Sequence, residues 1–400
     1  LRRQRQMCIR DSSRRIGRSD DRGLRRGGSV TATEREVAAQ EIVAESSPGL
    51  VKTITRAQAT QIVVVLFGLF ILFSLINPEA FVSVFNFRSI IVNASIFIVL
   101  GVGVTFVIIT AGIDLSIGSV LVFSSVMSAL VMEELGTEGW AIAAVGAVVA
   151  VLAGALWGLI NCLLVTKAKV PAFIVTLGTM GMALGISQVI TGGIDLYNVP
   201  EVLVDTVGFG NIFWEIPMLA VVALVVVIIG GLVLHRSKFG LYTYALGSNL
   251  EACRRVGIRV DFNLTWVYVV SGICAGIGGY LSLSLYQQTT IAGNSLTNLA
   301  VIAGVVIGGT SLFGGVGTMF GTVIGLLIPV TLRQGFVISG VQAFWQEVVV
   351  GIFLIGAVYI DGVRRARASR RSGIQPKQKT IGGLKIGSTR KEGDSEKKSN

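Results

Sequence analysis

Asp114 lies between two long apolar runs of this sequence, and its carboxylate is the first candidate for a functional group. The segment reads Gly-Ile-Asp-Leu-Ser-Ile-Gly-Ser, and its small and polar residues include Gly112, Asp114, Ser116, Gly118 and Ser119. Ionisable residues at membrane depth are costly and are therefore functional candidates. The glycines permit an irregular backbone, which a membrane tolerates where protein or a water-filled cavity surrounds it. The segment predicts a broken-helix junction or part of a solute pathway.

A plainer interpretation of the same segment is helix capping. The side chains of Asp114 and Ser116 can accept backbone N–H groups at the start of the following helix. We favour the cap for Asp114, and the two roles are compatible. A second Gly/Ser-rich stretch at 309–318 resembles the first, so Thr310 and Ser311 join the junction or pathway candidates.

A charged segment at 236–262 interrupts the apolar runs. Within it, Gly-Ser-Asn at 247–249 predicts a turn and a helix N-cap, followed by a short helix that ends at Gly257. Such a segment suits docking against a soluble partner, with Ala252 and Cys253 forming a small-residue face and Cys253 open to thiol cross-linking. An ordinary loop whose basic residues only anchor the topology is the equal alternative. The candidate contact residues are Gly247, Asn249, Glu251, Ala252, Cys253 and Gly257.

Other kinds of chemistry have few residues to draw on. His235 is the only histidine, and the four cysteines form no C-x-x-C pair. The sequence contains no H-E-x-x-H, no G-x-S-x-G and no P-loop motif. We therefore predict no catalytic residue, no metal site and no cofactor bound by this chain.

The elements that must position these segments are membrane helices. The chain has 400 residues, of which 52% are hydrophobic and only 14% charged, whereas soluble domains carry about 25% charged residues. The sequence thus predicts an all-α integral membrane protein of eight to ten crossings. The range reflects two junctions, at 112–116 and 315–317, that have almost no loop. The expected helices cover 57–76, 89–112, 116–134, 140–166, 172–191, 216–235, 263–287, 297–315, 317–334 and 342–361.

Glycines spaced by four residues recur within these runs. Such spacing places both glycines on one helix face and predicts close helix packing rather than a flexible gate. The sets are Gly154/Gly158, Gly181/Gly185, Gly272/Gly276, Gly304/Gly308 and Gly317/Gly321/Gly325.

The distribution of charge predicts the orientation and the domain limits. Basic residues cluster before the first helix, after the fourth, at 235–259 and after the last, whereas 192–215 carries four carboxylates and no Lys or Arg. With ten crossings, both termini face the cytoplasm. The expected membrane-spanning part is 57–362, and the charged tail 363–400 is expected to be a disordered cytoplasmic segment. The basic arm 1–56 is also expected to be disordered; its first 28 residues form no signal peptide and need not be native. The net charge of +11 collects in arms with few aromatics, which argues against nucleic-acid binding.

With these residues in hand, the chain from about 57 to 362 resembles the permease subunits of bacterial ABC importers for simple sugars, the ribose/xylose/galactose group. Four segments carry the resemblance in the family's order. They are G-I-D-L-S-I-G-S at 112–119, V-P-A-F-I-V-T-L-G-T at 170–179, G-x-N-x-E-A at 247–252 with Gly257, and I-G-G-T-S-L-F-G-G-x-G-T at 307–318.

The resemblance implies a complex in the bacterial inner membrane. Its expected parts are two permease copies, identical or paired, cytoplasmic ATPase subunits that use ATP and Mg²⁺, and a periplasmic or lipid-anchored sugar-binding protein. The pathway would lie between the permeases. Residues 247–258 would be the coupling helix, seated in a cleft of the ATPase, with Cys253 in place of the second Ala of the family's E-A-A-x-x-x-G pattern.

Three rival interpretations stay open. Permeases for nucleosides or branched-chain amino acids are more distant relatives of the same class. An ion-coupled secondary transporter usually needs several intramembrane charges, and Asp114 is nearly alone here. A membrane-embedded enzyme lacks the motifs its chemistry would require.

Overall fold

The computed structural model describes residues 58–136, 138–212, 215–292 and 297–342, with scattered positions between 345 and 363. All of them belong to the unit that begins at Ala57. The predictions for 1–56 and for the tail after 363 lie outside the described residues, as does most of the expected last helix at 342–361.

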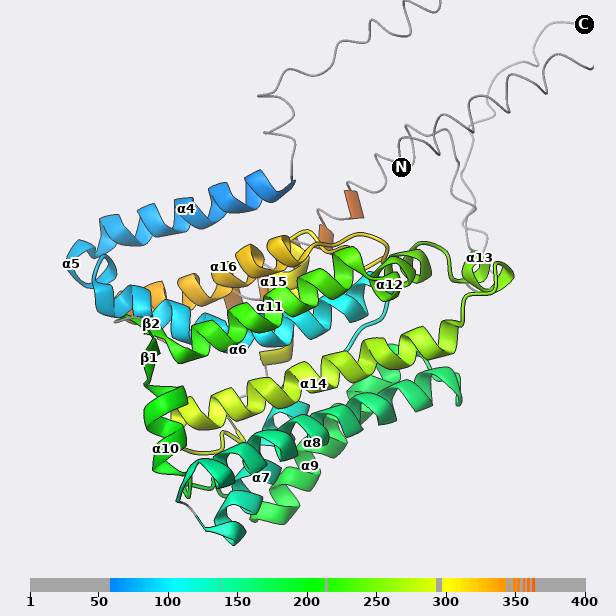
Figure 1. The fold of residues 1–400 in the computed structure, drawn as a ribbon. Coiled ribbons are helices and arrows are strands. Elements are labelled where there is room, and N and C mark those ends of the chain that lie inside the picture. Colours follow the sequence, from blue (N-terminus) through cyan, green and yellow to red (C-terminus); the bar gives the residue numbers. More distant parts are fainter. Residues whose placement is uncertain are drawn as a thin grey trace, which may run out of the picture. The chain divides into compact units, whose positions relative to one another are not determined.

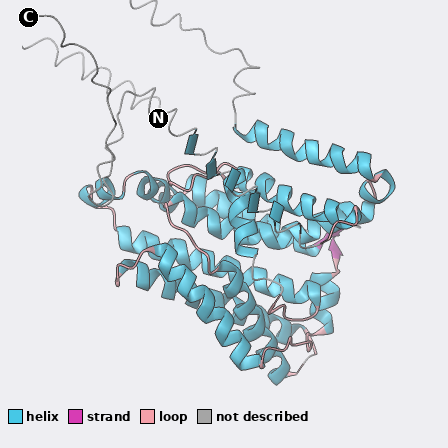
Figure 2. Cartoon of the chain, turned by 180° about the vertical axis from the view of Figure 1, so that it is seen from behind, coloured by secondary structure: helices cyan, strands magenta, loops and turns pink. Residues whose placement is uncertain are grey.

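Helices make up most of the described chain, and its strands form one short hairpin (Figures 1 and 2). The first helices are α4 (Gln58–Ile76), α5 (Pro78–Phe81), α6 (Val84–Ile109), α7 (Ile117–Leu135), α8 (Trp140–Thr166) and α9 (Ala172–Thr191). After them come α10 (Glu201–Leu203), the π-helix η1 (Val204–Gly208), and the antiparallel strands β1 (Asn211–Ile212) and β2 (Ile216–Pro217). The chain continues through α11 (Met218–Arg236), α12 (Lys238–Ser248), α13 (Leu250–Arg255), α14 (Val260–Tyr286), α15 (Thr297–Ile307) and α16 (Met319–Ile338).

Seven of these helices are long and apolar enough to cross a membrane: α6, α7, α8, α9, α11, α14 and α16. Two shorter apolar helices, Thr60–Ile76 and Thr297–Ile307, accompany them. Their outward-facing side chains are apolar, as at Leu152, Val189 and Ile229, each more than half exposed, which suits contact with lipid tails. The prediction of an all-α, multi-pass membrane protein is confirmed, whereas the number ten and the orientation stay predictions.

Two expected elements differ from those observed. The helix expected at 297–315 ends at Ile307, because glycines at 308 and 309 follow and Gly309 has φ +96°, so α15 is only roughly 16 Å long. The polar segment 236–262 holds two helices, α12 and α13, where one short helix was expected.

Helix α14 lies at the centre of the described bundle, and it packs against α8, α7 and α6 (Figure 1). Glycines of α8 meet glycines of α14 there: a Cβ placed on Gly154 would lie 2.8 Å from the backbone nitrogen of Gly276. The predicted close packing is therefore confirmed for 154/158 with 272/276, and likewise for 304/308 with 321/325. Within the part of the chain that the structure describes, it is not found for Gly181 and Gly185, because a Cβ added at either glycine would have nothing within 4 Å.

Candidate functional site: a helix junction beside an exposed helix

Helix α6 ends at the predicted junction in a left-handed turn. The N–H of Ala111 donates to the carbonyl of Ile108 (2.9 Å), and the N–H of Gly112 donates to that of Val107 (3.1 Å). Ala111 has φ +60°, a conformation that usually requires glycine at this position of a helix C-cap. No side chain fits at Gly112, because a Cβ there would lie 2.9 Å from the hydroxyl of Tyr268.

Asp114 is buried in the turn that follows, with only 3% of its surface exposed. Its Oδ1 accepts hydrogen bonds from the backbone N–H of Ser116 (3.0 Å) and from the Ser116 hydroxyl (2.6 Å). Its Oδ2 accepts one from the hydroxyl of Ser271 on α14 (2.8 Å). Asp114 thus bonds the N-cap residue of α7 and not an N–H of the helix itself, and Ser116 makes no side-chain cap of α7, so the predicted side-chain cap is not formed. Gly118 and Ser119 are buried in the first turn of α7.

The hydrogen bonds continue from Ser116 into α8 and α9. The Asn161 amide donates to the Ser116 hydroxyl (2.8 Å), and its carbonyl oxygen accepts from Thr179 (2.6 Å). Thr176 donates to the backbone carbonyl of Ile113 (3.0 Å). Sequence reasoning missed Asn161 and Ser271 as partners; the only signal was a lone polar residue in an apolar run. The connected groups tie α7, α8, α9 and α14 together, and Asp114, Ser116 and Asn161 are buried within the chain.

A second break, between α15 and α16, contacts the first. Thr310 and Ser311 are buried there, at 1% and 9% exposure, and Thr318 caps α16 by accepting the N–H of Gly321 (3.0 Å). The N–H of Gly315 donates to the carbonyl of Ile109, at the end of α6 (2.8 Å). The second Gly/Ser-rich stretch is therefore joined backbone to backbone to the end of α6, just before the first stretch begins.

Helix α12 ends on the same contact. A Cβ on Gly247 would lie 2.5 Å from the backbone nitrogen of Gly315, and it would also overlap the carbonyl oxygen of Ile109. Gly247 lies in the last turn of α12, so its prediction as a turn residue was wrong; its role is to let three backbones meet. Burial raises the pKa of Tyr244 above its usual value, which keeps the phenol protonated, and its hydroxyl donates to the carbonyl of Gly317 (2.7 Å).

Helix α13 follows at once, with both ends capped as predicted. Asn249 Oδ1 accepts the N–H of Ala252 (2.9 Å). At the other end Gly257 has φ +82°, and the N–H of Ile258 returns to the carbonyl of Cys253 (3.0 Å). These bonds satisfy backbone groups that a six-residue helix could not satisfy alone.

The exposed face of α13 differs from the expected one. Cys253 is 4% exposed and packs against Leu246 and Val260, so it is neither part of an outer face nor open to cross-linking. Its position beneath the helix follows from α13 resting on α12 and the start of α14. Ala252 is exposed, beside Glu251 and Arg255, which form a surface ion pair (3.5 Å).

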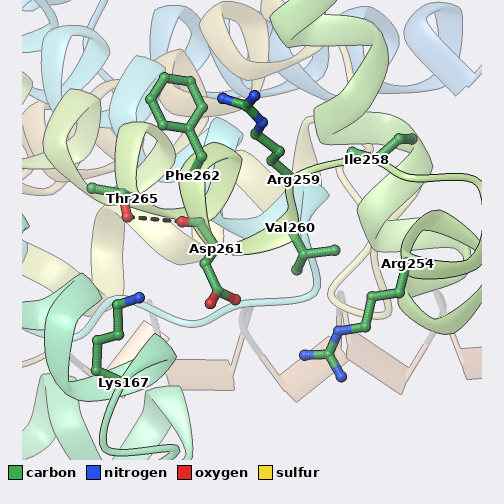
Figure 3. A pocket seen from close by; sticks show the side chains of 8 residues that line it. All are labelled: Lys167, Arg254, Ile258, Arg259, Val260, Asp261, Phe262 and Thr265. Atoms are coloured by element: carbon green, nitrogen blue, oxygen red, sulfur yellow. Dashed lines mark hydrogen bonds between the residues drawn. The ribbon is translucent and has the colours of Figure 1, made fainter.

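A pocket of about 620 Å³ lies beside α13, and Figure 3 shows its side chains. It is basic, because Lys167 from the end of α8, Arg254 from α13 and Arg259 from the start of α14 line it against one carboxylate, Asp261. Figure 3 shows the Arg259 side chain pointing the opposite way from that of Asp261. The Asp261 backbone carbonyl accepts a hydrogen bond from Thr265 (2.8 Å). This end of the bundle therefore offers a short capped helix next to a cationic hollow.

Comparison with known proteins places the helix breaks and the α12–α13 segment in a known family. The family described as "Branched-chain amino acid transport system / permease component" matches residues 86–358. The chain belongs to this family. The matched range lies inside the predicted permease part, 57–362, and includes both breaks, α12 and α13.

Individual relatives are similar over most of their length. The D-allose transport system permease protein of Escherichia coli is 36% identical over 72% of this chain and 87% of the relative. The ribose import permease protein of Bacillus subtilis is 37% identical over 75% and 92%. The autoinducer 2 import system permease protein of Yersinia pseudotuberculosis is 30% identical over 76% and 84%. No solved structure matches the chain.

Proposed function

We propose that this chain is the membrane-spanning permease subunit of an ABC importer that carries a monosaccharide across the bacterial inner membrane. The observation that carries the substrate class is the similarity to permeases named for D-allose and ribose. The proposed complex has two permease copies with the pathway between them, an external binding protein, and a separate ATPase subunit that uses ATP and Mg²⁺.

The contact with the ATPase is proposed at α13. This helix is exposed at Glu251 and Ala252 and is fixed by caps at both ends, so it meets a partner already shaped, as helix-in-groove recognition requires. The neighbouring pocket adds Lys167 and Arg254, and these cations suit carboxylates around the partner's groove.

Transmission from α13 to the membrane is proposed through the glycine contact behind it. Asn249, the N-cap of α13, follows Gly247 by two residues, and Gly247 touches the ends of both helix breaks. Asp114, Ser116, Thr310 and Ser311 then hold those breaks in shape rather than contacting the solute. A shift of α13 would act on α6 and α16 together.

The deciding experiment is import into proteoliposomes. The full chain, with its ATPase and binding protein, is expected to accumulate D-ribose or D-allose only when ATP is hydrolysed. The chain without partners is expected to accumulate neither sugar under a proton or sodium gradient. Gradient-driven accumulation would replace the ABC assignment by a secondary transporter.

A second substrate class has its own support. The family description names branched-chain amino acids, so L-leucine belongs in the same assay. ATP-dependent uptake of L-leucine without uptake of either sugar would transfer the proposal to that class. A nucleoside such as uridine serves as the remaining comparison.

A further inference from the structure

A second pocket of about 620 Å³ opens at the end of α14 farthest from α13. In the proposed orientation this end faces the outside of the cell. Three aromatic rings line the pocket: Tyr197 before α10, Phe209 after η1 and Tyr286 at the last turn of α14. Each ring is about half exposed or more, at 65%, 50% and 47%. The volume lies in the range of roughly 300–1,000 Å³ that small-molecule sites occupy.

The backbone around this pocket is held firmly. Asp195 Oδ1 accepts hydrogen bonds from the Thr289 hydroxyl (3.0 Å) and from the N–H of Ile291 (2.9 Å). The Thr289 hydroxyl in turn accepts the N–H of Leu196 (2.9 Å). On the other side, η1 lies so close to α14 that a Cβ on Gly208 would overlap the carbonyl of Ser284. The lining side chains therefore project from a fixed frame.

Two uncommon backbone features coincide at this pocket. Gln287 caps α14 at φ +58°, a conformation that residues with a Cβ seldom adopt, although glycine would serve the cap equally well. Asp205 lies on η1, and π-helical turns are rare and concentrate at functional sites. Both features bring a polar side chain into the lining.

The polar groups of the pocket suit a neutral polyol. Glu201 and Asp205 supply carboxylates, and Gln287 and Gln288 supply amides, while the lining residues that the structure describes include no Lys or Arg. Carboxylates and amides accept and donate paired hydrogen bonds to neighbouring hydroxyl groups, and an aromatic face packs on the C–H face of a pyranose or furanose ring. Arg88 donates to the backbone carbonyl of Phe209 at the edge of the pocket (3.3 Å), so the two carboxylates are not the only charged groups nearby. A sugar is favoured here because its paired hydroxyl groups and its apolar ring face match the carboxylates, the amides and the aromatic rings together.

We infer that this pocket is a saccharide-contact site, at which a monosaccharide released at the outer end of the permease is held before it enters the pathway. The inference rests on the proposed function for its substrate class and for the outward orientation. It adds a binding site on the permease itself. The affinity for the sugar is expected to be low, because the rings and carboxylates are solvent-exposed.

Saturation-transfer NMR on the full chain in phosphatidylethanolamine/phosphatidylglycerol nanodiscs tests it without ATPase or binding protein. D-ribose and D-allose are the probes, and L-leucine is the comparison. We expect saturation transfer to the C–H protons of at least one sugar and none to L-leucine. Phe209→Ala, and the double change Glu201→Gln with Asp205→Asn, should each weaken binding about tenfold. Glu134→Gln, at an exposed carboxylate outside the pocket, should leave it unchanged.

Three outcomes would overturn the inference. One is the absence of saturation transfer to either sugar, and another is equal transfer in the wild type and the pocket variants. The third is loss of ATP-driven import in the pocket variants with no sugar binding to the permease alone, which would assign the pocket to the docking of the binding protein. In each case, normal sugar import by the wild-type complex leaves the proposed function standing, so the two failures are distinguishable.

Discussion

At the scale of single residues, Asp114 is the carboxylate that joins the start of α7 to α14. It receives only neutral donors, the Ser116 backbone and hydroxyl and the Ser271 hydroxyl, yet it is almost fully buried. Removing an acceptor at such a place strands the donors, and this loss outweighs the modest value of the bonds themselves.

Asp114→Ala should therefore lower the stability of the folded chain by about 1–3 kcal/mol, because two hydroxyls and one backbone N–H lose their acceptor. The effect is measured as the melting temperature in detergent, with the loss of monodisperse protein on heating as the readout. Ser124→Ala is the matched control, since its hydroxyl is buried on α7 without a hydrogen-bond partner in the described part of the chain. It should be neutral or stabilising. An unchanged melting temperature for Asp114→Ala would contradict a structural role for the carboxylate.

Ala111 offers a prediction of the opposite sign. Its φ of +60° disfavours any residue with a Cβ by about 1–2 kcal/mol, so Ala111→Gly should stabilise the junction by up to about 1 kcal/mol after the added freedom of the unfolded chain is subtracted. Ala155→Gly, inside the regular helix α8, should destabilise by about 1 kcal/mol. The same thermal assay compares them, and a loss of stability in both variants would show that Ala111 is not strained.

At the scale of elements, α13 is tested by a bulky side chain on its exposed face. Ala252→Trp leaves the helix caps and the buried Cys253 untouched, so the chain should fold normally. We expect a loss of co-purified ATPase, and of permease-stimulated ATP hydrolysis, of at least about tenfold, because an added ring cannot enter a packed groove.

The control for that experiment is Ile194→Trp. Ile194 is 68% exposed and lies in the connection between α9 and α10, away from α13. It should retain assembly and coupled hydrolysis. Normal assembly with Ala252→Trp would place the ATPase contact on another segment.

The sequence predicted these elements unevenly, and the reasons are physical. Asn249 and Gly257 were recognised as caps because capping depends on local residue types. Helix α12 was not anticipated, since 11 residues of mixed polarity give no membrane signal. The shortening of α15 was also missed, because glycines at 308 and 309 scarcely change the hydropathy that defined the window.

The side-chain partners within the junction were harder still to predict. Asn161 and Ser271 lie 45 and 157 residues from the groups they contact. Each is a polar residue in an apolar run, and the sequence does not say which face of its helix it occupies. The burial of Cys253 was misjudged for a related reason: it depends on how α13 rests on α12 and α14, which is a tertiary contact.

At the scale of the whole bundle, the packing of α8 on α14 is the prediction with the largest expected effect. Gly154→Val should prevent the two helices from approaching, because even a Cβ would meet the backbone of Gly276, and the folded yield should fall severely. Gly185→Val on α9, where an added Cβ would have nothing within 4 Å, is the matched control and should be tolerated. The yield of monodisperse protein is compared for the two variants by size-exclusion chromatography. Similar profiles would mean that α8 and α14 can separate without unfolding.

The glycine contact between α6, α12 and the 308–318 stretch has a mechanical consequence. Side-chain contacts are compliant, since a rotamer change absorbs a small displacement before it travels further. The contact of Gly247 with Ile109 and Gly315 contains no side chain to rotate, and Gly315 is bonded directly to Ile109. This contact therefore has little freedom to deform, and in the proposed function a displacement of α12 would pass directly to the C-terminal end of α6 and to the segment that precedes α16. In that proposal, the rigid contact would let a movement of the six-residue helix α13, which follows α12, reach two membrane helices.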